Sequence, residues 1–173
     1  LDANQIDLKR KIVDISSLTI SDPIVALQNY KGNRQERTTY TSETPAPGSQ
    51  LQWNRDNWIM QVANLNIDNG TFKTDKIDSI PLLSSFDGKH IDFNHINTVF
   101  TNLRWDQDTI SAHLKLNTKE RNGFEVKNML ADVKFTPREM TFNHLNIQTN
   151  KSNIKDYFSM SYADFSDMDD FVD

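Results

Sequence analysis

The sequence predicts an all-β fold: a long, curved antiparallel meander sheet folded into an open trough. Several runs of residues alternate between apolar and polar with a period of two, turn residues separate these runs, and no long amphipathic helix pattern occurs. Hydrophobic residues make up only 36% of the chain, yet it contains ten Phe, three Trp and four Tyr. This composition suits an ordered but thin structure, in which one layer of apolar side chains does most of the burying.

The clearest strand pattern covers residues 109–116, with the sequence TISAHLKL. Its apolar residues fall on one face and its polar residues on the other, as in a half-buried strand. The apolar face holds Ile110, Ala112, Leu114 and Leu116, and the polar face holds Ser111, His113 and Lys115. From about residue 91 onward, strands and turns alternate every 10 to 15 residues, which favours an antiparallel meander.

Turn residues separate the predicted strands. Asn69-Gly70 predicts a tight hairpin turn, because both residue types tolerate positive φ. Asn122-Gly123 and Asp87-Gly88 also predict turns, and residues 136–139 (TPRE) place Pro at the second position of another. Asp106 and Asp108 flank Gln107 between two strands, a pattern typical of a turn.

The 173 residues are expected to form a single β-rich segment with two irregular parts. Residues 31–50 are polar and contain two Pro and two Gly, which predicts a flexible surface loop. Near the end, Phe165, Met168 and Phe171 have helical spacing, so a short C-terminal helix is expected. The sequence begins with Leu1 rather than Met, and we expect it to come from a longer protein.

A short pattern recurs along the chain: an apolar residue, two mostly polar residues, an apolar residue, any residue, then an apolar residue or Thr. It begins at Ile15, Val62, Phe93, Phe100, Val126 and Phe142. A step of three residues puts the next apolar side chain on the opposite face of a flat strand. A β-bulge or bend at the intervening pair, which often ends in Asn or His, would restore the face. Repeated bends in neighbouring strands would curve the sheet. The alternative is an ordinary sandwich of strands joined by short turns.

The composition excludes several classes of function. A net charge of −5 argues against nucleic acid as the main partner. The chain has no cysteine, so disulfides and thiolate metal sites are excluded. The four histidines do not form a local zinc motif, although His95 and His144 could meet if their strands were neighbours. No nucleophile elbow, Walker A loop or dinucleotide-binding motif occurs. We therefore expect no catalytic residue, metal or cofactor.

Two regions resemble a known family. The stretch IVDISSLTISDPIVALQNYKG (12–32) resembles the strand pair that recurs near the start of AsmA-like proteins. The stretches LNTKERNGFEVKNMLADVKFTPREMTFNHLNIQTNKSNI (116–154) and SYADFSDMDDF (161–171) are similar to the N-terminal region of Bacteroidota-type translocation and assembly module (TamB) proteins. The resemblance covers most of residues 1–173 apart from the 31–50 loop, but its motifs are strand and turn patterns.

The resemblance implies a periplasmic bridge protein, anchored in the inner membrane by an N-terminal helix that this sequence lacks. Such proteins curl a long β-sheet into a trough with an apolar interior. They are linked to phospholipid transport between the two membranes. Some act with an Omp85-type partner in outer-membrane protein assembly. The expected ligand is therefore a phospholipid or another acyl-chain lipid.

The best candidates for lining the lipid groove lie on the apolar face of the 109–116 strand and on the two runs that meet at Pro137. They are Ile110, Ala112, Leu114, Leu116, Val133, Phe135, Met140 and Phe142. Alternatively, these residues form a closed core against another sheet. In that case the chain would be a secreted or surface β-sandwich that binds a glycan or protein ligand, using Trp53, Trp58 or Trp105. An enzyme on a sandwich or solenoid is a third hypothesis, which no catalytic motif supports.

Overall fold

The computed structural model describes residues 1–29, 52–76, 79–82, 85 and 87–162. These residues form one sheet, and none of them is helical. The strands are β1 (Asp2–Asp7), β2 (Ile12–Ser21), β3 (Ile24–Asn29), β4 (Ile59–Lys76), β5 (Asp92–Asp106), β6 (Thr109–Glu120), β7 (Glu125–Phe135), β8 (Glu139–Thr149) and β9 (Asn153–Ser161). The expected 31–50 loop and the expected C-terminal helix lie outside the described residues.

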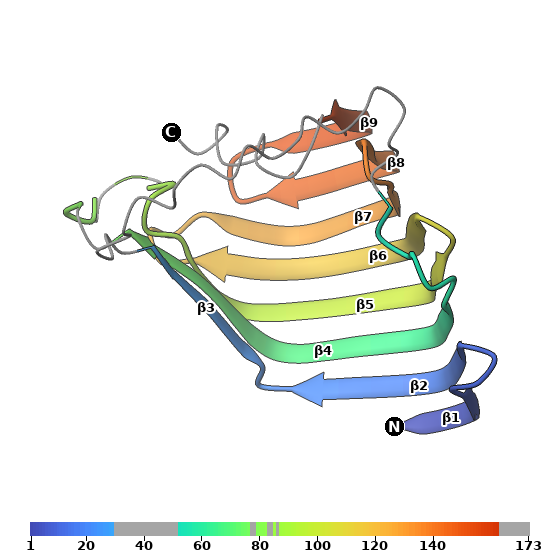
Figure 1. Ribbon diagram of the computed structural model, residues 1–173. Coiled ribbons are helices and arrows are strands. Elements are labelled where there is room, and N and C mark those ends of the chain that lie inside the picture. Colours follow the sequence, from blue (N-terminus) through green and yellow to red (C-terminus); the bar gives the residue numbers. More distant parts are fainter. Residues whose placement is uncertain (30–51, 77–78, 83–84, 86, 163–173) are drawn as a thin grey trace, which may run out of the picture.

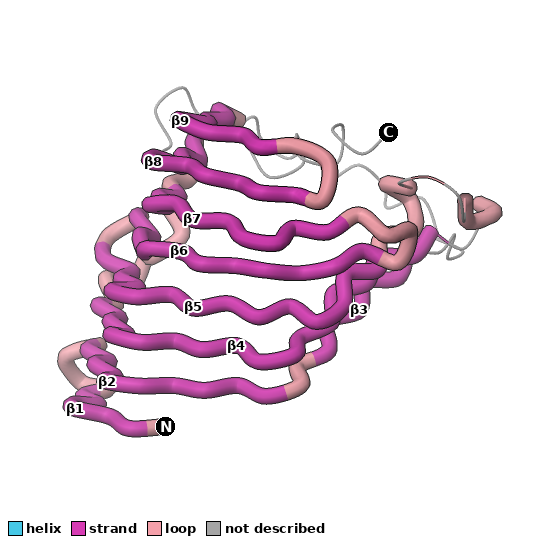
Figure 2. The backbone as a smooth tube through the Cα atoms, turned by 180° about the vertical axis from the view of Figure 1, so that it is seen from behind, coloured by secondary structure: helices cyan, strands magenta, loops and turns pink. Residues whose placement is uncertain are grey.

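The sheet is open and mostly antiparallel, with the order β1-β2-β4-β5-β6-β7-β8-β9 (Figure 1). From β4 to β9 each strand pairs with the next one in the chain, which confirms the predicted meander. Figures 1 and 2 show the long strands bending along their length, so that the sheet curls. The predicted trough fold is therefore confirmed. Within the part of the chain that the structure describes, no second sheet faces the first, so the sandwich alternative is wrong there.

One region departs from the antiparallel prediction. Both β2 and β3 pair with β4 in parallel, one after the other along its length. Pro23 interrupts them without reversing the chain, because hydrogen bonds to β4 continue on both sides of it. Asp22 N donates to Asp68 O at 2.9 Å, and Thr71 N donates to Pro23 O at 2.8 Å. The expected strand pair is therefore present as β2 and β3, which run in the same direction along β4 on either side of Pro23.

The prediction of a hairpin turn at Asn69-Gly70 is wrong. Both residues lie inside β4, which continues to Lys76. Asn69 does adopt positive φ, at 54°, but Gly70 does not. A primed hairpin turn reverses the chain. It needs positive φ at both central residues (type I′) or at the first of them (type II′). Here the single left-handed residue produces a bulge, seen as register shifts between β4 and β5 on both sides of Gly70.

The other turns are where the sequence predicted them. Gly123 has φ of 91° in the β6–β7 turn, and Gly123 N donates to Glu120 O at 2.9 Å. Thr136 N donates to Glu139 O at 2.8 Å across the Pro137 turn. In the loop before β5, His90 N donates to Asp87 O at 3.1 Å. Gln107 has φ of 51° in the β5–β6 turn. Local turn chemistry was therefore a good guide except at Asn69.

The recurring pattern marks real bends in β5 and β8. His95, Asn102 and His144, each the second intervening residue, have φ between 50° and 54°. Register shifts accompany all three positions. The bulges return the next apolar residue to the original face, as predicted. In β7, a register shift with β8 after Val126 marks the same step.

The bends of neighbouring strands are joined by their side chains. Asn69 Nδ2 donates to Asp22 Oδ1 at 2.6 Å, and His95 Nδ1 donates to Asn69 Oδ1 at 2.9 Å. All three residues have φ between 51° and 54°. Left-handed backbone positions therefore align across the β2–β3 junction, β4 and β5. We call this line of residues the crease, because the sheet bends along it.

Candidate functional site

The eight predicted groove residues lie on one face of the sheet. Cross-strand partners share a face. Ile110 is opposite Phe135, and Ala112 is opposite Val133. Val133 is in turn opposite Phe142, and Phe135 is opposite Met140. Leu114 and Leu116 follow on the same face of β6. The structure thus brings the set together across β6, β7 and β8. Their contact with lipid stays a prediction.

The apolar face extends well beyond the predicted set. A hydrophobic cluster joins it to further residues on β5, β7 and β8: Phe100, Leu103, Met129, Ala131, Leu145 and Ile147. On the other side of β5, Val62 lies opposite Leu103 and Ile15 lies opposite Val62. The recurring pattern contains all of these residues. Their position on one continuous face depends on the strand order, which a local pattern does not reveal.

Burial shows that this face is concave. Ala112, Ala131, Val133 and Leu145 are only 4% to 6% exposed, although the described residues contain no second layer above them. Larger side chains on the same face shield them. Phe142 packs against Phe135 with ring centroids 5.9 Å apart and against Phe158 at 5.8 Å. On the opposite face His113 and Lys115 are exposed. We call the concave apolar face the trough.

Polar residues close one end of the apolar face. Thr118 and Glu120 continue the inward-facing row of β6 and are buried, at 8% and 2% exposure. The Glu120 carboxylate accepts hydrogen bonds from Asp92 N at 3.2 Å and Asn122 N at 2.7 Å. These bonds satisfy a buried carboxylate, so the residue stabilises the loop ends of β5 and β6.

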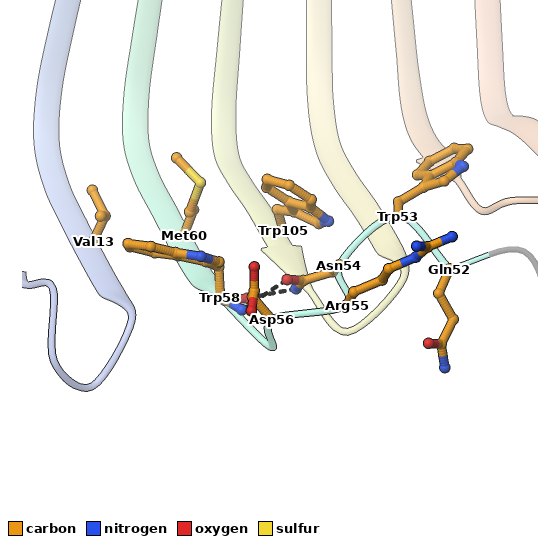
Figure 3. Close-up of a pocket in the computed structure, with 9 residues that line it drawn as sticks. All are labelled: Val13, Gln52, Trp53, Asn54, Arg55, Asp56, Trp58, Met60 and Trp105. Carbon is orange, nitrogen blue, oxygen red and sulfur yellow. Dashed lines mark hydrogen bonds between the residues drawn. The ribbon is translucent and has the colours of Figure 1, made fainter.

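At the opposite end, all three tryptophans of the chain gather around a cleft of about 650 Å³. Trp105 and Met60 are cross-strand partners on the trough face, and Val13 is opposite Met60. Trp53 and Trp58 come from the loop that precedes β4 (Figure 3). The remaining lining residues are Gln52, Asn54, Arg55 and Asp56. We call this site the tryptophan cleft. Its apolar floor is the end of the trough.

The loop of the tryptophan cleft is held firmly in place. Asp108 Oδ1 accepts hydrogen bonds from Trp53 N at 2.8 Å and Asn54 N at 2.9 Å. The buried Asn54 side chain bonds the Trp58 backbone twice, at 2.7 Å each. The two aspartates of the β5–β6 turn therefore differ in role. The Asp106 side chain forms an ion pair with the nearby Arg104, whereas Asp108 anchors a distant loop. No local pattern in the sequence indicates this long-range contact.

The histidines do not meet as the metal hypothesis required. His95 is on β5 and contacts Asn69, whereas His144 is on β8. His144 Nδ1 instead bonds Asp132 Oδ2 at 2.7 Å, and His113 bonds the other oxygen of the same carboxylate. The hydrogen bonds from His113 and His144 lower the pKa of Asp132. Among the described residues, no group of three or more potential ligands is arranged to hold a metal.

An Asp–His–Ser arrangement that no sequence motif indicated joins the end of β4 to the loop that follows it. His90 Nδ1 is 2.5 Å from Asp75 Oδ1, and His90 Nε2 is 2.7 Å from Ser79 Oγ. Serine hydrolases use this order of hydrogen bonds. Here, however, the imidazole is only 4% exposed while the Asp75 side chain is 50% exposed. Ser79 Oγ also contacts Lys76 O at 3.1 Å. These hydrogen bonds hold the loop that follows β4 against the end of that strand.

Comparison with known proteins identifies no relative: no family model, curated protein or solved structure matches the chain. The described residues also contain no helix that could cross a bilayer. The resemblance to AsmA-like and TamB proteins therefore enters below only as part of a proposal.

Proposed function

We propose that this chain is a non-catalytic segment of a periplasmic AsmA/TamB-like bridge, whose trough shelters acyl chains as lipids move between the inner and outer membranes. The observation that carries the proposal is the continuous, concave apolar face of a single-layer sheet. Soluble proteins rarely leave a large, continuous apolar face without a partner, so such a face indicates a binding surface.

The shape of the trough suits an acyl chain. Eight strands follow one another along the sheet, and a spacing of about 4.8 Å makes the trough about 34 Å long. One leaflet of bilayer hydrocarbon is about 15 Å thick, half of the usual 30 Å. A single acyl chain therefore fits along the floor with room to spare, while its head group stays in water at the open side.

The two faces of the sheet also differ as this function requires. The floor presents Phe, Leu, Ile and Val side chains, and the outer face presents exposed residues such as Lys115 and Lys134. A conduit that crosses an aqueous compartment needs water-compatible outer walls around an apolar interior. The role in outer-membrane protein assembly, through an Omp85-type partner, would involve other parts of the longer protein.

The test is lipid loading. Protein purified without detergent should carry phospholipid in native mass spectra and take up a fluorescent fatty acid. Leu114→Lys places a charge on the floor opposite Phe100 and should weaken uptake about tenfold or more. Folding should be affected less, because a lysine at the open floor can extend its amine into water.

Lys115→Glu is the matched control, since it changes the neighbouring residue on the outer face and should leave uptake unchanged. A protein that carries no lipid and takes up no fatty acid would contradict the proposal. If the lipid-free protein were also dimeric, a second copy of the chain would cover the apolar face. If Leu114→Lys failed to fold, Leu114 would belong to a closed core.

A further inference from the structure

We propose that the tryptophan cleft binds a saccharide ring, so that the lipid held in the trough is a glycolipid. Its sugar would lie in the cleft and its acyl chain on the adjoining floor. This inference rests on the proposed function for the acyl chain, but the cleft supplies separate evidence for the sugar.

The first evidence is aromatic. The rings of Trp53, Trp58 and Trp105 lie in a row across the strand ends, and all three residues are only partly buried (Figure 3). Indole rings combine a broad apolar face with a polar edge, which suits a boundary between apolar and wet surroundings. A pyranose has the matching chemistry, because its C–H groups form an apolar face and its hydroxyl groups point outward.

The second evidence is a set of unused hydrogen-bonding groups. Trp105 Nε1 is buried and has no hydrogen-bond partner among the described residues. Buried donors are nearly always paired, so this one marks a place for an acceptor such as a sugar hydroxyl. The side chains of Gln52 and Arg55 line the same cleft, and neither bonds another residue in the described part of the chain.

The charge of the cleft favours a neutral ligand over a phosphate. Arg55 is the only cation among the lining residues. Its neighbour Asp56 is acidic and forms an ion pair with Lys11 at 3.0 Å. Phosphate groups are usually held by several cationic or backbone donors together. A ligand with many hydroxyl groups and no charge fits this cleft better.

The loop that forms the cleft is also preorganised for binding. The bonds from Asp108 and Asn54 fix the loop, so little ordering is needed when a ligand enters. Its volume of about 650 Å³ is in the range of small-molecule sites. Because Val13, Met60 and Trp105 belong to the trough face, a chain attached to the sugar continues directly onto the floor.

The experiment compares amphiphiles that share one tail and differ in head group. Octyl β-glucoside, octyl phosphocholine and tetraethylene glycol octyl ether, each below its micellar concentration, compete with a dansyl-labelled fatty acid. Maltose, a disaccharide of glucose, tests a saccharide that has no alkyl tail. Because the three tryptophans all line the cleft, intrinsic fluorescence reports on that site. We expect the glucoside to bind about tenfold more tightly than the other two amphiphiles.

Two variants locate the preference. Trp105→Phe keeps an aromatic ring and removes the indole N–H, and Trp53→Ala removes a ring that lies outside the sheet. Each should reduce the preference for the glucoside over the ether about fivefold. Urea unfolding verifies that each variant is folded. The Leu114→Lys variant should weaken all three amphiphiles equally and preserve the response to maltose.

The outcomes separate the two proposals. Equal binding of all three amphiphiles, a preference for phosphocholine, or a glucoside preference that survives both tryptophan variants would each overturn the sugar site and leave the lipid trough standing. A response to maltose without binding of any amphiphile would identify a site for free saccharide and overturn both the glycolipid and the proposed function. No response to any probe would overturn both proposals.

Discussion

Asn102 offers a direct test of the idea that left-handed residues bend the strands. It lies in β5 with φ of 54°, its side chain is exposed, and that side chain makes no hydrogen bond or ion pair with any residue that the structure describes. Substitution therefore changes the backbone preference without removing a side-chain hydrogen bond or ion pair. Asn tolerates the left-handed region, whereas a β-branched residue strongly disfavours it.

The expected magnitude follows from this geometry. Asn102→Val should destabilise the protein by about 2 kcal/mol, the upper part of the usual cost of a left-handed L-residue. With a denaturant slope of about 2 kcal/mol per molar, the urea midpoint should fall by about 1 M. Asn102→Gly should be close to neutral or slightly stabilising, because glycine adopts positive φ freely.

Lys115→Val is the matched control. Lys115 is also exposed in a strand, on β6, but its φ is not positive. Valine has a higher strand propensity than lysine, so this variant should be neutral or should stabilise the protein by less than about 1 kcal/mol. Urea unfolding followed by tryptophan fluorescence measures all three variants. If valine costs no more at position 102 than at position 115, the bend is not set by the residue at 102 and the reasoning fails.

Three further predictions concern single contacts. Asp108→Ala should lower the free energy of unfolding by about 1–3 kcal/mol, because the backbone N–H of Trp53 loses its acceptor. The same variant should increase the quenching of tryptophan fluorescence by acrylamide. Asp106→Ala is the control and should lower the free energy of unfolding by under about 0.5 kcal/mol. Asp132→Asn should cost less than about 1 kcal/mol at neutral pH, because the carboxylate is partly exposed. The pKa of Asp132 is lowered in the folded protein, so the carboxylate contributes its full stabilisation above the ordinary carboxyl range. The difference in urea midpoint between Asp132→Asn and wild type should therefore shrink as the pH falls below about 4. Gly70→Ala should lower the free energy of unfolding by about 1 kcal/mol, seen as a lower urea midpoint, since the new Cβ would lie 3.3 Å from the Ile67 side chain.

Much of the fold followed from local patterns in the sequence. The period of two in residues 109–116 correctly assigned the inner and outer faces of β6. The step of three before Ile96, Leu103 and Leu145 correctly located bulges, because Asn and His adopt positive φ more readily than most residues. Turn residues at 122–123 and 136–139 also acted locally. Each of these signals depends on a few neighbouring residues.

The candidate site was only partly predictable. The shared face of the eight candidate residues on β6, β7 and β8 was predictable, because consecutive antiparallel strands keep each other's faces in register. The tryptophan cleft was not found, because Trp105 is 47 residues from Trp58 along the chain (105 − 58) and only the pairing of β4 with β5 brings their regions together. The contact of Asp108 with the Trp53 loop depends on the same pairing.

The sequence by itself determined which residues of β6 point inward and where β5 and β8 bend, because alternation and backbone preference are properties of short segments. The tertiary structure decided which strands become neighbours. It placed β2 and β3 in parallel along β4, turned Asn69-Gly70 from an apparent hairpin into a bulge, and assembled the crease from Asp22, Asn69 and His95. Those outcomes depend on long-range hydrogen bonds and side-chain packing, which a local pattern does not encode.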